Sequence, residues 1–133
     1  MRFYADTSLL CSYYGSDAHS PRADAWRQSN PVALPFTPLH GLELRNAFEP
    51  AVFQQRLTAA EAAQAWLLVE NDLREGFLEQ MEAPLVDAFR EAEILAANHT
   101  AQIGARSLDV LHVAAAKLLR VEELATFDPR QAP

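Results

Sequence analysis

Four acidic residues are the side chains of this sequence whose type and position best suit chemistry: Asp6, Glu43, Asp109 and Asp128. Carboxylate oxygens are the ligands that hard divalent cations such as Mg²⁺ prefer in proteins. Carboxylates that a fold gathers in one place repel each other unless a cation lies between them. If the fold brings these four acids together, the chemistry that we expect there is that of a bound divalent metal.

Two of the acids follow short apolar runs. Asp6 comes directly after residues 3–5, and Asp128 comes directly after residues 124–127. We interpret each run as a buried strand. If the two strands are parallel neighbours, both acids emerge at one edge of the sheet, which is where open α/β folds bind their ligands.

The other two acids lie on helices with apolar periodicity. Asp109 shares its helix face with Val113 and Ala116, and such small neighbours favour a half-buried carboxylate that requires a cation. The alternative is an acid that stabilises the helix dipole near a helix start. Glu43 borders an apolar face between Leu42 and Leu44, and its alternative is a solvated surface glutamate.

The sequence leaves further alternatives open at this edge. Asp6 has the position of an N-cap for a helix over residues 7–14, and Asp128 precedes Pro129 in a pattern that is also typical of a turn. Thr126 has a hydroxyl that can bond a ligand or a neighbouring strand. His112 can be a metal ligand, although a lone histidine on such a face is more often packed and hydrogen-bonded.

Strands alternate with helices along the chain. We expect strands at residues 2–6, 32–36, 77–81 and within 121–127, and helices at 7–14, 21–29, 38–55, 59–75, from Pro84 onward and at 107–120. This alternation predicts βαβ units with right-handed crossovers and a parallel sheet.

Local signals fix several helix boundaries. Ser20 and Thr37 each precede a proline and are predicted N-caps, and Thr58 with Glu61 has the spacing of a capping box. Pro50 is expected to bend or split its helix. Pro35 removes one hydrogen-bond donor from its strand.

Composition limits the class of protein. The chain has 133 residues, half of them hydrophobic, with a net charge of −7, which predicts one domain, residues 1–133, and argues against broad, charge-driven nucleic-acid binding. We find no secretory signal and no apolar stretch that could span a bilayer. A lone Cys11 excludes a thiolate-rich zinc site and fits a reducing cytosol, so we expect a cytoplasmic protein.

The order of four motifs resembles PIN-domain proteins, specifically the VapC toxins of bacterial toxin–antitoxin pairs. The motifs are Phe-Tyr-Ala-Asp-Thr-Ser-Leu-Leu at 3–10, Leu-Glu-Leu-Arg-Asn-Ala at 42–47, Leu-Asp-Val-Leu-His-Val-Ala-Ala-Ala at 108–116 and Thr-Phe-Asp at 126–128. The third motif is the most specific. The resemblance covers the whole chain and implies a three-layer PIN-like α/β fold, with a central parallel β-sheet and helices on both faces.

The resemblance also implies a function. It implies a metal-dependent endoribonuclease, the toxin of a type II system, in which Asp6, Glu43, Asp109 and Asp128 hold Mg²⁺ or Mn²⁺ and a water activated by the metal hydrolyses RNA. The implied partners are the RNA substrate, a cognate antitoxin and a second copy in a homodimer. Such toxins usually continue into one more helix and strand, so we expect those elements to be missing or truncated here.

Two rival functions remain open at this point. One is a catalytically silent PIN fold that serves as a protein-binding module. The other is a metal-dependent phosphatase that acts on small phosphomonoesters.

Overall fold

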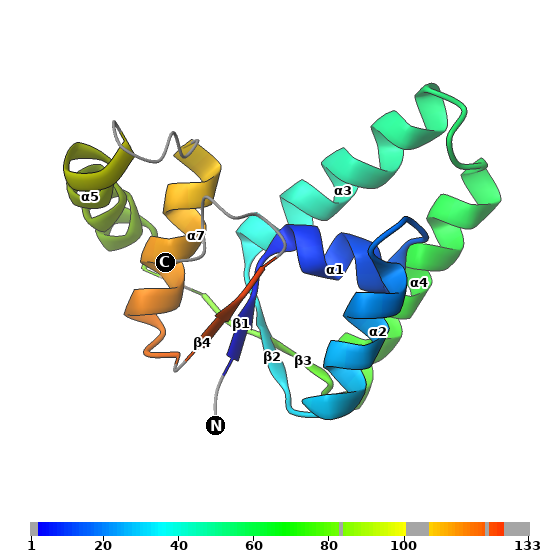
Figure 1. Ribbon diagram of the computed structural model, residues 1–133, viewed down its shortest axis with the longest axis horizontal. Helices are drawn as coiled ribbons and strands as arrows, with labels where there is room; N and C mark the ends of the chain where they lie inside the picture. Colours follow the sequence, from blue (N-terminus) through cyan, green and yellow to red (C-terminus); the bar gives the residue numbers. More distant parts are fainter. Residues whose placement is uncertain (1–2, 83, 101–106, 122, 127–133) are drawn as a thin grey trace.

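Four short strands and seven helical segments make up the described part of the chain, which is residues 3–82, 84–100, 107–121 and 123–126 of a computed structural model. Figure 1 shows their arrangement. In chain order they are β1 (Phe3–Ala5), α1 (Thr7–Tyr14), α2 (Ser20–Ser29), β2 (Leu34–Phe36), α3 (Pro38–Phe53), α4 (Ala59–Glu75), β3 (Leu78–Gln80), α5 (Leu85–Leu95), the π-helical turn η1 (Ala96–Thr100), α7 (Ser107–Leu118) and β4 (Glu123–Ala125). None of the helices in this part of the chain is long and apolar enough to cross a membrane.

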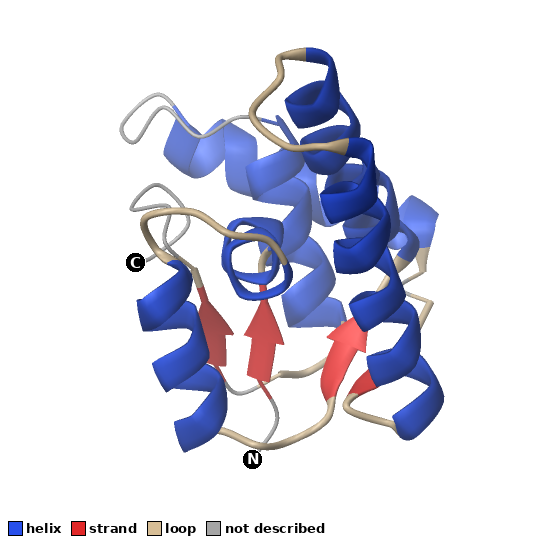
Figure 2. Cartoon of the chain, turned by 90° about the vertical axis from the view of Figure 1, so that its right-hand side faces the viewer, coloured by secondary structure: helices blue, strands red, loops and turns tan. Residues whose placement is uncertain are grey.

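The strands are parallel, as the alternation predicted. β1 pairs with β4 and β2 pairs with β3, while β1 and β2 contact each other without a regular ladder. The visible strand arrows in Figure 2 point the same way. The predicted adjacency of the first and last strands is therefore confirmed, and the end of β1 lies beside the end of β4.

Pro35 accounts for the interruption between β1 and β2. Leu34 donates its N–H to Phe77, and Phe36 accepts from Met81, so both of these residues turn their backbone groups toward β3. Backbone groups alternate in direction along a strand, so Pro35 between them faces β1, where it has no N–H to donate.

Helices cover both faces of the strands, which confirms the predicted three layers. Phe3 and Ala5 belong to the larger apolar cluster, with side chains of α1, α3 and α4. Tyr4 points to the opposite face and packs with Ala115 and Ala116 of α7, because successive side chains of a strand alternate between faces. Figure 1 shows α5 and α7 on one side of the strands and α1, α2 and α4 on the other.

The capping signals predicted two helix starts correctly and one wrongly. Thr37 and Thr58 both cap their helices through complete capping boxes, and Gly76 ends α4 in the left-handed conformation, with φ 85°. Ser20, however, is the first residue of α2 and not its cap. Its hydroxyl is engaged elsewhere: it accepts from the Asp17 N–H at 2.9 Å and donates to the Ser12 carbonyl at 2.6 Å.

Two further features of the helices concern α3 and α5. α3 runs through Pro50 without splitting and ends three residues later. In α5, Ala88 is buried, whereas 55% of Phe89 is exposed. α5 packs on α7, whose buried face carries several alanines, and the close approach that small side chains allow selects Ala88 for the contact.

Candidate active site

Asp6 lies at the carboxyl end of β1, where it caps α1 and reaches β4. Its Oδ1 accepts hydrogen bonds from the Leu9 N–H at 3.1 Å and the Ser8 hydroxyl at 2.7 Å. Its Oδ2 accepts a hydrogen bond from the hydroxyl of Thr126. The cap interpretation of Asp6 is thus confirmed. The carboxylate also lies at the sheet edge where a site was expected.

The environment of Asp6 disfavours its charge. Only 3% of the residue is exposed, and no Lys or Arg in the described part of the chain forms an ion pair with it. Burial raises the pKa of the Asp6 carboxyl above its ordinary value, and the hydrogen bonds from Thr126, Ser8 and Leu9 and the charge of His112 offset this only in part. A buried carboxylate of this kind is stabilised by a bound cation.

Glu43 reaches the same region from the second turn of α3. Its Oε1 accepts a hydrogen bond from the Thr7 hydroxyl at 3.0 Å, and it also contacts Nε2 of His112. The side chain keeps 22% of its surface exposed. The interpretation of Glu43 as a solvated surface residue is therefore wrong, and Thr7, the neighbour of Asp6 in sequence, connects the two candidate acids.

Opposing effects determine the ionisation of Glu43. Burial raises the pKa of its carboxyl, but hydrogen bonds from His112 and Thr7 and the charge of His112 outweigh burial, so the pKa lies below its ordinary value. Glu43 is thus held ionised, in the form that a metal ligand requires.

His112 is packed and hydrogen-bonded at both ring nitrogens. The ring is 1% exposed. Nδ1 lies 2.6 Å from the Tyr4 hydroxyl, and Nε2 lies 3.1 Å from the Thr7 hydroxyl and also contacts Glu43. Both ring nitrogens are thus engaged, which favours the packed, hydrogen-bonded alternative for His112 over that of a metal ligand.

His40 is a buried residue of this region to which the sequence assigned no role. Its Nδ1 accepts from the Thr37 N–H at 3.0 Å, and its Nε2 donates to the Ala5 carbonyl at 2.8 Å. Burial, and then the charge of nearby His112, lower the pKa of His40 from 6.5 to about 3, against the opposing bond to Ala5. The neutral ring joins the ends of β1 and β2, where Pro35 leaves their ladder incomplete.

The other two candidate acids are placed only in part. Asp109 lies in the first turn of α7, three residues before His112, but its side chain lies outside the described part of the structure. Asp128 lies outside the described residues altogether, two positions beyond Thr126. Among the described residues, no group of three or more His, Cys, Asp or Glu side chains could hold a metal. The described part of the chain thus offers Asp6 and Glu43 as candidate ligands, and the contribution of Asp109 and Asp128 stays a prediction.

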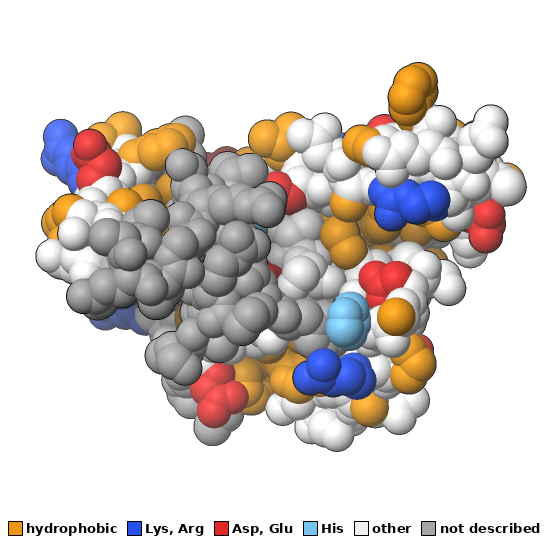
Figure 3. All heavy atoms as spheres, turned by 45° about the horizontal axis from the view of Figure 1, so that its top comes forward, with side chains coloured by type: hydrophobic (Ala, Val, Ile, Leu, Met, Phe, Trp, Pro, Cys, Tyr) orange, Lys and Arg blue, Asp and Glu red, His pale blue; other side chains and the backbone are white. Residues whose placement is uncertain are grey.

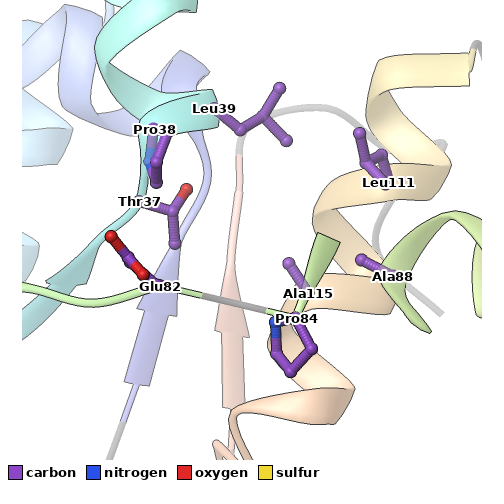
Figure 4. A pocket seen from close by; sticks show the side chains of 8 residues that line it. All are labelled: Thr37, Pro38, Leu39, Glu82, Pro84, Ala88, Leu111 and Ala115. Carbon is purple, nitrogen blue, oxygen red and sulfur yellow. The ribbon is translucent and has the colours of Figure 1, made fainter. Parts of the chain in front are cut away.

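Two hollows lie near these residues. One, of about 560 Å³, lies between the start of α3 and helices α5 and α7, and Figure 4 shows its mostly apolar lining. Of the candidate acids whose side chains the structure describes, neither Asp6 nor Glu43 lines it. The other, of about 420 Å³, is lined by Leu9 and Thr126, which both hydrogen-bond Asp6, and by Arg22 and Trp26 of α2.

Comparison with known proteins supports the resemblance at the level of the fold. The sequence matches no family model and no curated protein. The structure is similar to the crystal structure of VapC20 from Mycobacterium tuberculosis, a toxin that cleaves the sarcin-ricin loop, with a TM-score of 0.69 and 16% sequence identity over 96% of this chain and 90% of that chain. The chain therefore has the PIN-domain fold of a VapC toxin, as its motifs predicted.

Proposed function

We propose that this protein is a metal-dependent endoribonuclease of the VapC type, which hydrolyses RNA phosphodiester bonds at Asp6, Glu43, Asp109 and Asp128. The observation that carries the proposal is the hydrogen bond to Glu43 from the hydroxyl of Thr7, the residue that follows Asp6 at the carboxyl end of β1, in a fold similar to that of a VapC toxin. VapC20 is described as a toxin that cleaves RNA at the sarcin-ricin loop.

The donor set fits Mg²⁺ or Mn²⁺. Asp6 and Glu43 offer only oxygen ligands, which hard cations prefer. Glu43 uses Oε1 for Thr7 and His112, and its Oε2 makes no hydrogen bond within the described part of the chain. Asp6 is buried without a cationic partner there. When bound, the metal ion supplies an activated water and neutralises charge on the scissile phosphate.

The protein residues supply the orientation. Ser8 and Leu9 hold Oδ1 of Asp6, and Thr126 holds Oδ2. Thr7 holds Glu43. Hydrogen bonds of this kind restrict the rotamers of both carboxylates before substrate arrives, so less of the binding energy is spent on ordering them.

We propose that RNA binds at a local site and not over a broad basic surface. The net charge is −7, and on the face in Figure 3 the visible Lys and Arg side chains are scattered. The hollow beside Asp6 carries Arg22 and Trp26, and a guanidinium with an indole is a combination that binds phosphate and stacks an unpaired base.

As the toxin of a type II pair, the protein would have a cognate antitoxin as its partner, act as a homodimer and work in the cytoplasm. Co-expression with the product of the neighbouring reading frame tests this part of the proposal. We expect that product to restore growth that the protein alone inhibits.

The activity itself is tested by incubation of the purified protein with structured RNA, single-stranded DNA and p-nitrophenyl phosphate, with Mn²⁺ or with EDTA. We expect cleavage of RNA alone, and only with metal. Hydrolysis of p-nitrophenyl phosphate without RNA cleavage would indicate the phosphatase. Inertness toward all three, together with binding of a protein partner, would indicate the catalytically silent module.

A further inference from the structure

We propose that His112 is the positioning residue of this site, which fixes Glu43 through Nε2 and thereby sets the affinity for the divalent cation. The inference rests on the proposed function. It adds a residue whose role is to hold a ligand in place, since both of its own nitrogens are already engaged.

The hydrogen-bond network determines which atom of the ring carries a hydrogen. Thr7 donates its hydroxyl hydrogen to Glu43, so toward His112 the Thr7 oxygen can only accept. Glu43, ionised, is also only an acceptor. Nε2 of His112 must therefore carry a hydrogen, and it is shared between these two oxygens.

Tyr4 supports the same arrangement from the other side of the ring. Burial raises the pKa of the Tyr4 hydroxyl above its ordinary value, so the hydroxyl keeps its hydrogen. Tyr4 can donate that hydrogen to Nδ1 of a neutral ring or accept one from a protonated ring. The hydrogen on Nε2 faces Glu43 in both cases.

The position of His112 connects the elements of the site. The ring belongs to α7, Tyr4 to β1, Thr7 to α1 and Glu43 to α3. The rings of Tyr4 and His40 pack against it, with centroids 5.6 Å and 5.0 Å away. His112 thus connects α7, which carries Asp109, to α3, which carries Glu43. This contact restricts the orientation of the long, partly exposed Glu43 side chain.

Two substitutions separate this role from simple packing. In His112→Gln the amide nitrogen lies about where Nε2 was, so a donor to Glu43 is kept. In His112→Asn the shorter amide lies near the position of Nδ1, so Tyr4 keeps a partner and Glu43 loses its donor. Each variant keeps one side of the network, so we expect similar losses in melting temperature.

The decisive readout is the affinity of the full chain for Mn²⁺, measured by calorimetry without RNA, followed by kcat and KM for RNA cleavage. Removal of a residue that orients a metal ligand typically costs 10–100-fold. We expect His112→Asn to lose roughly tenfold or more in Mn²⁺ affinity and in kcat with little change in KM, and His112→Gln to stay within about threefold of the parent. Tyr4→Phe, which leaves Nε2 on Glu43, should resemble the Gln variant.

Equal losses of Mn²⁺ affinity in the Gln and Asn variants would overturn the inference and leave His112 a packing residue. Parental affinity in His112→Asn would overturn it as well. If His112→Asn does not fold, a folded His112→Gln that loses tenfold or more in affinity contradicts the inference by itself. A parent chain that neither binds Mn²⁺ nor cleaves RNA would instead overturn the proposed function, and this inference with it.

Discussion

The hydroxyl of Thr126 donates a hydrogen bond to Oδ2 of Asp6, across 120 positions of sequence. This bond joins the carboxyl ends of β4 and β1, where the backbone N–H of Asp6 also donates to the Ala125 carbonyl at 3.0 Å. The last strand thus reaches the first candidate acid directly. Asp6 serves as helix cap and as sheet-edge carboxylate at the same time, with one oxygen for each.

We predict that two substitutions of Asp6 differ from each other in stability. Folding raises the pKa of this carboxyl. Above the raised pKa the carboxyl is ionised in the folded protein, which lowers the free energy of unfolding. At low pH, where both the folded and the unfolded chain are protonated, this loss is absent. Asp6→Asn removes the charge and keeps an oxygen for the cap, so without metal at neutral pH it should unfold at the same or higher denaturant concentration than the parent. Asp6→Ala loses the cap and should be about 1 kcal/mol less stable than Asp6→Asn. Equal stability of the two variants would contradict this.

We predict that His40 makes the protein sensitive to acid. Its pKa falls from 6.5 to about 3 on folding, so below pH 6.5 the unfolded chain binds more protons than the folded one. The free energy of unfolding should therefore fall as pH drops from about 6.5 toward 3, by about 2 kcal/mol between pH 7 and pH 5 from this residue. Denaturant titrations at several pH values measure it. His40→Gln should be less stable at pH 7 with a shallower slope below pH 6.5, and an unchanged slope would contradict the assignment.

We predict that Arg22 contributes to RNA binding and not to the reaction. It lines the hollow beside Asp6, so Arg22→Ala should raise KM for RNA several-fold and leave kcat within about twofold, because lost phosphate contacts weaken binding. Arg74→Ala is the matched control, since Arg74 lies exposed near the end of α4. Equal effects of the two substitutions would mean that the loss is one of overall charge.

We predict that divalent metal stabilises the folded chain. A cation that binds the gathered carboxylates and not the unfolded chain adds about 2.7 kcal/mol at 100 times its dissociation constant. The melting temperature should rise with Mn²⁺, and the rise should shrink in Asp6→Asn but not in Asp24→Asn, an exposed acid on α2. A melting temperature indifferent to millimolar Mn²⁺ would favour the binding module.

Periodicity and caps predicted most of the fold, since local signals such as Thr37 before Pro38 and Thr58 before Glu61 act within one helical turn. Where long-range packing determines a helix start or a buried face, the local sequence pattern was not sufficient to predict it. The hydroxyl of Ser20 bonds to the Asp17 N–H and the Ser12 carbonyl and does not cap α2. The face of α5 that is buried is the one that contacts α7.

For the site, the sequence predicted the acids but not the groups that hold Asp6 and Glu43. The partners of Asp6 and Glu43 include Thr126 and His112, which lie 120 and 69 positions away, so no local spacing could reveal them. His40 did carry a local signal, because it occupies the third helical position after Thr37. That position usually holds Glu or Gln, and a histidine there completes the same capping box.

The rate of RNA cleavage by Glu43→Gln in saturating Mn²⁺, compared with Glu49→Gln, tests the central claim most directly. Both substitutions remove one charge from α3, and Glu49 is exposed. If Glu43 binds the metal that activates water, Glu43→Gln should lose roughly a hundredfold or more in kcat, while Glu49→Gln keeps the parental rate. Parental cleavage by a folded Glu43→Gln would contradict the proposal that this protein is a ribonuclease that acts through these carboxylates.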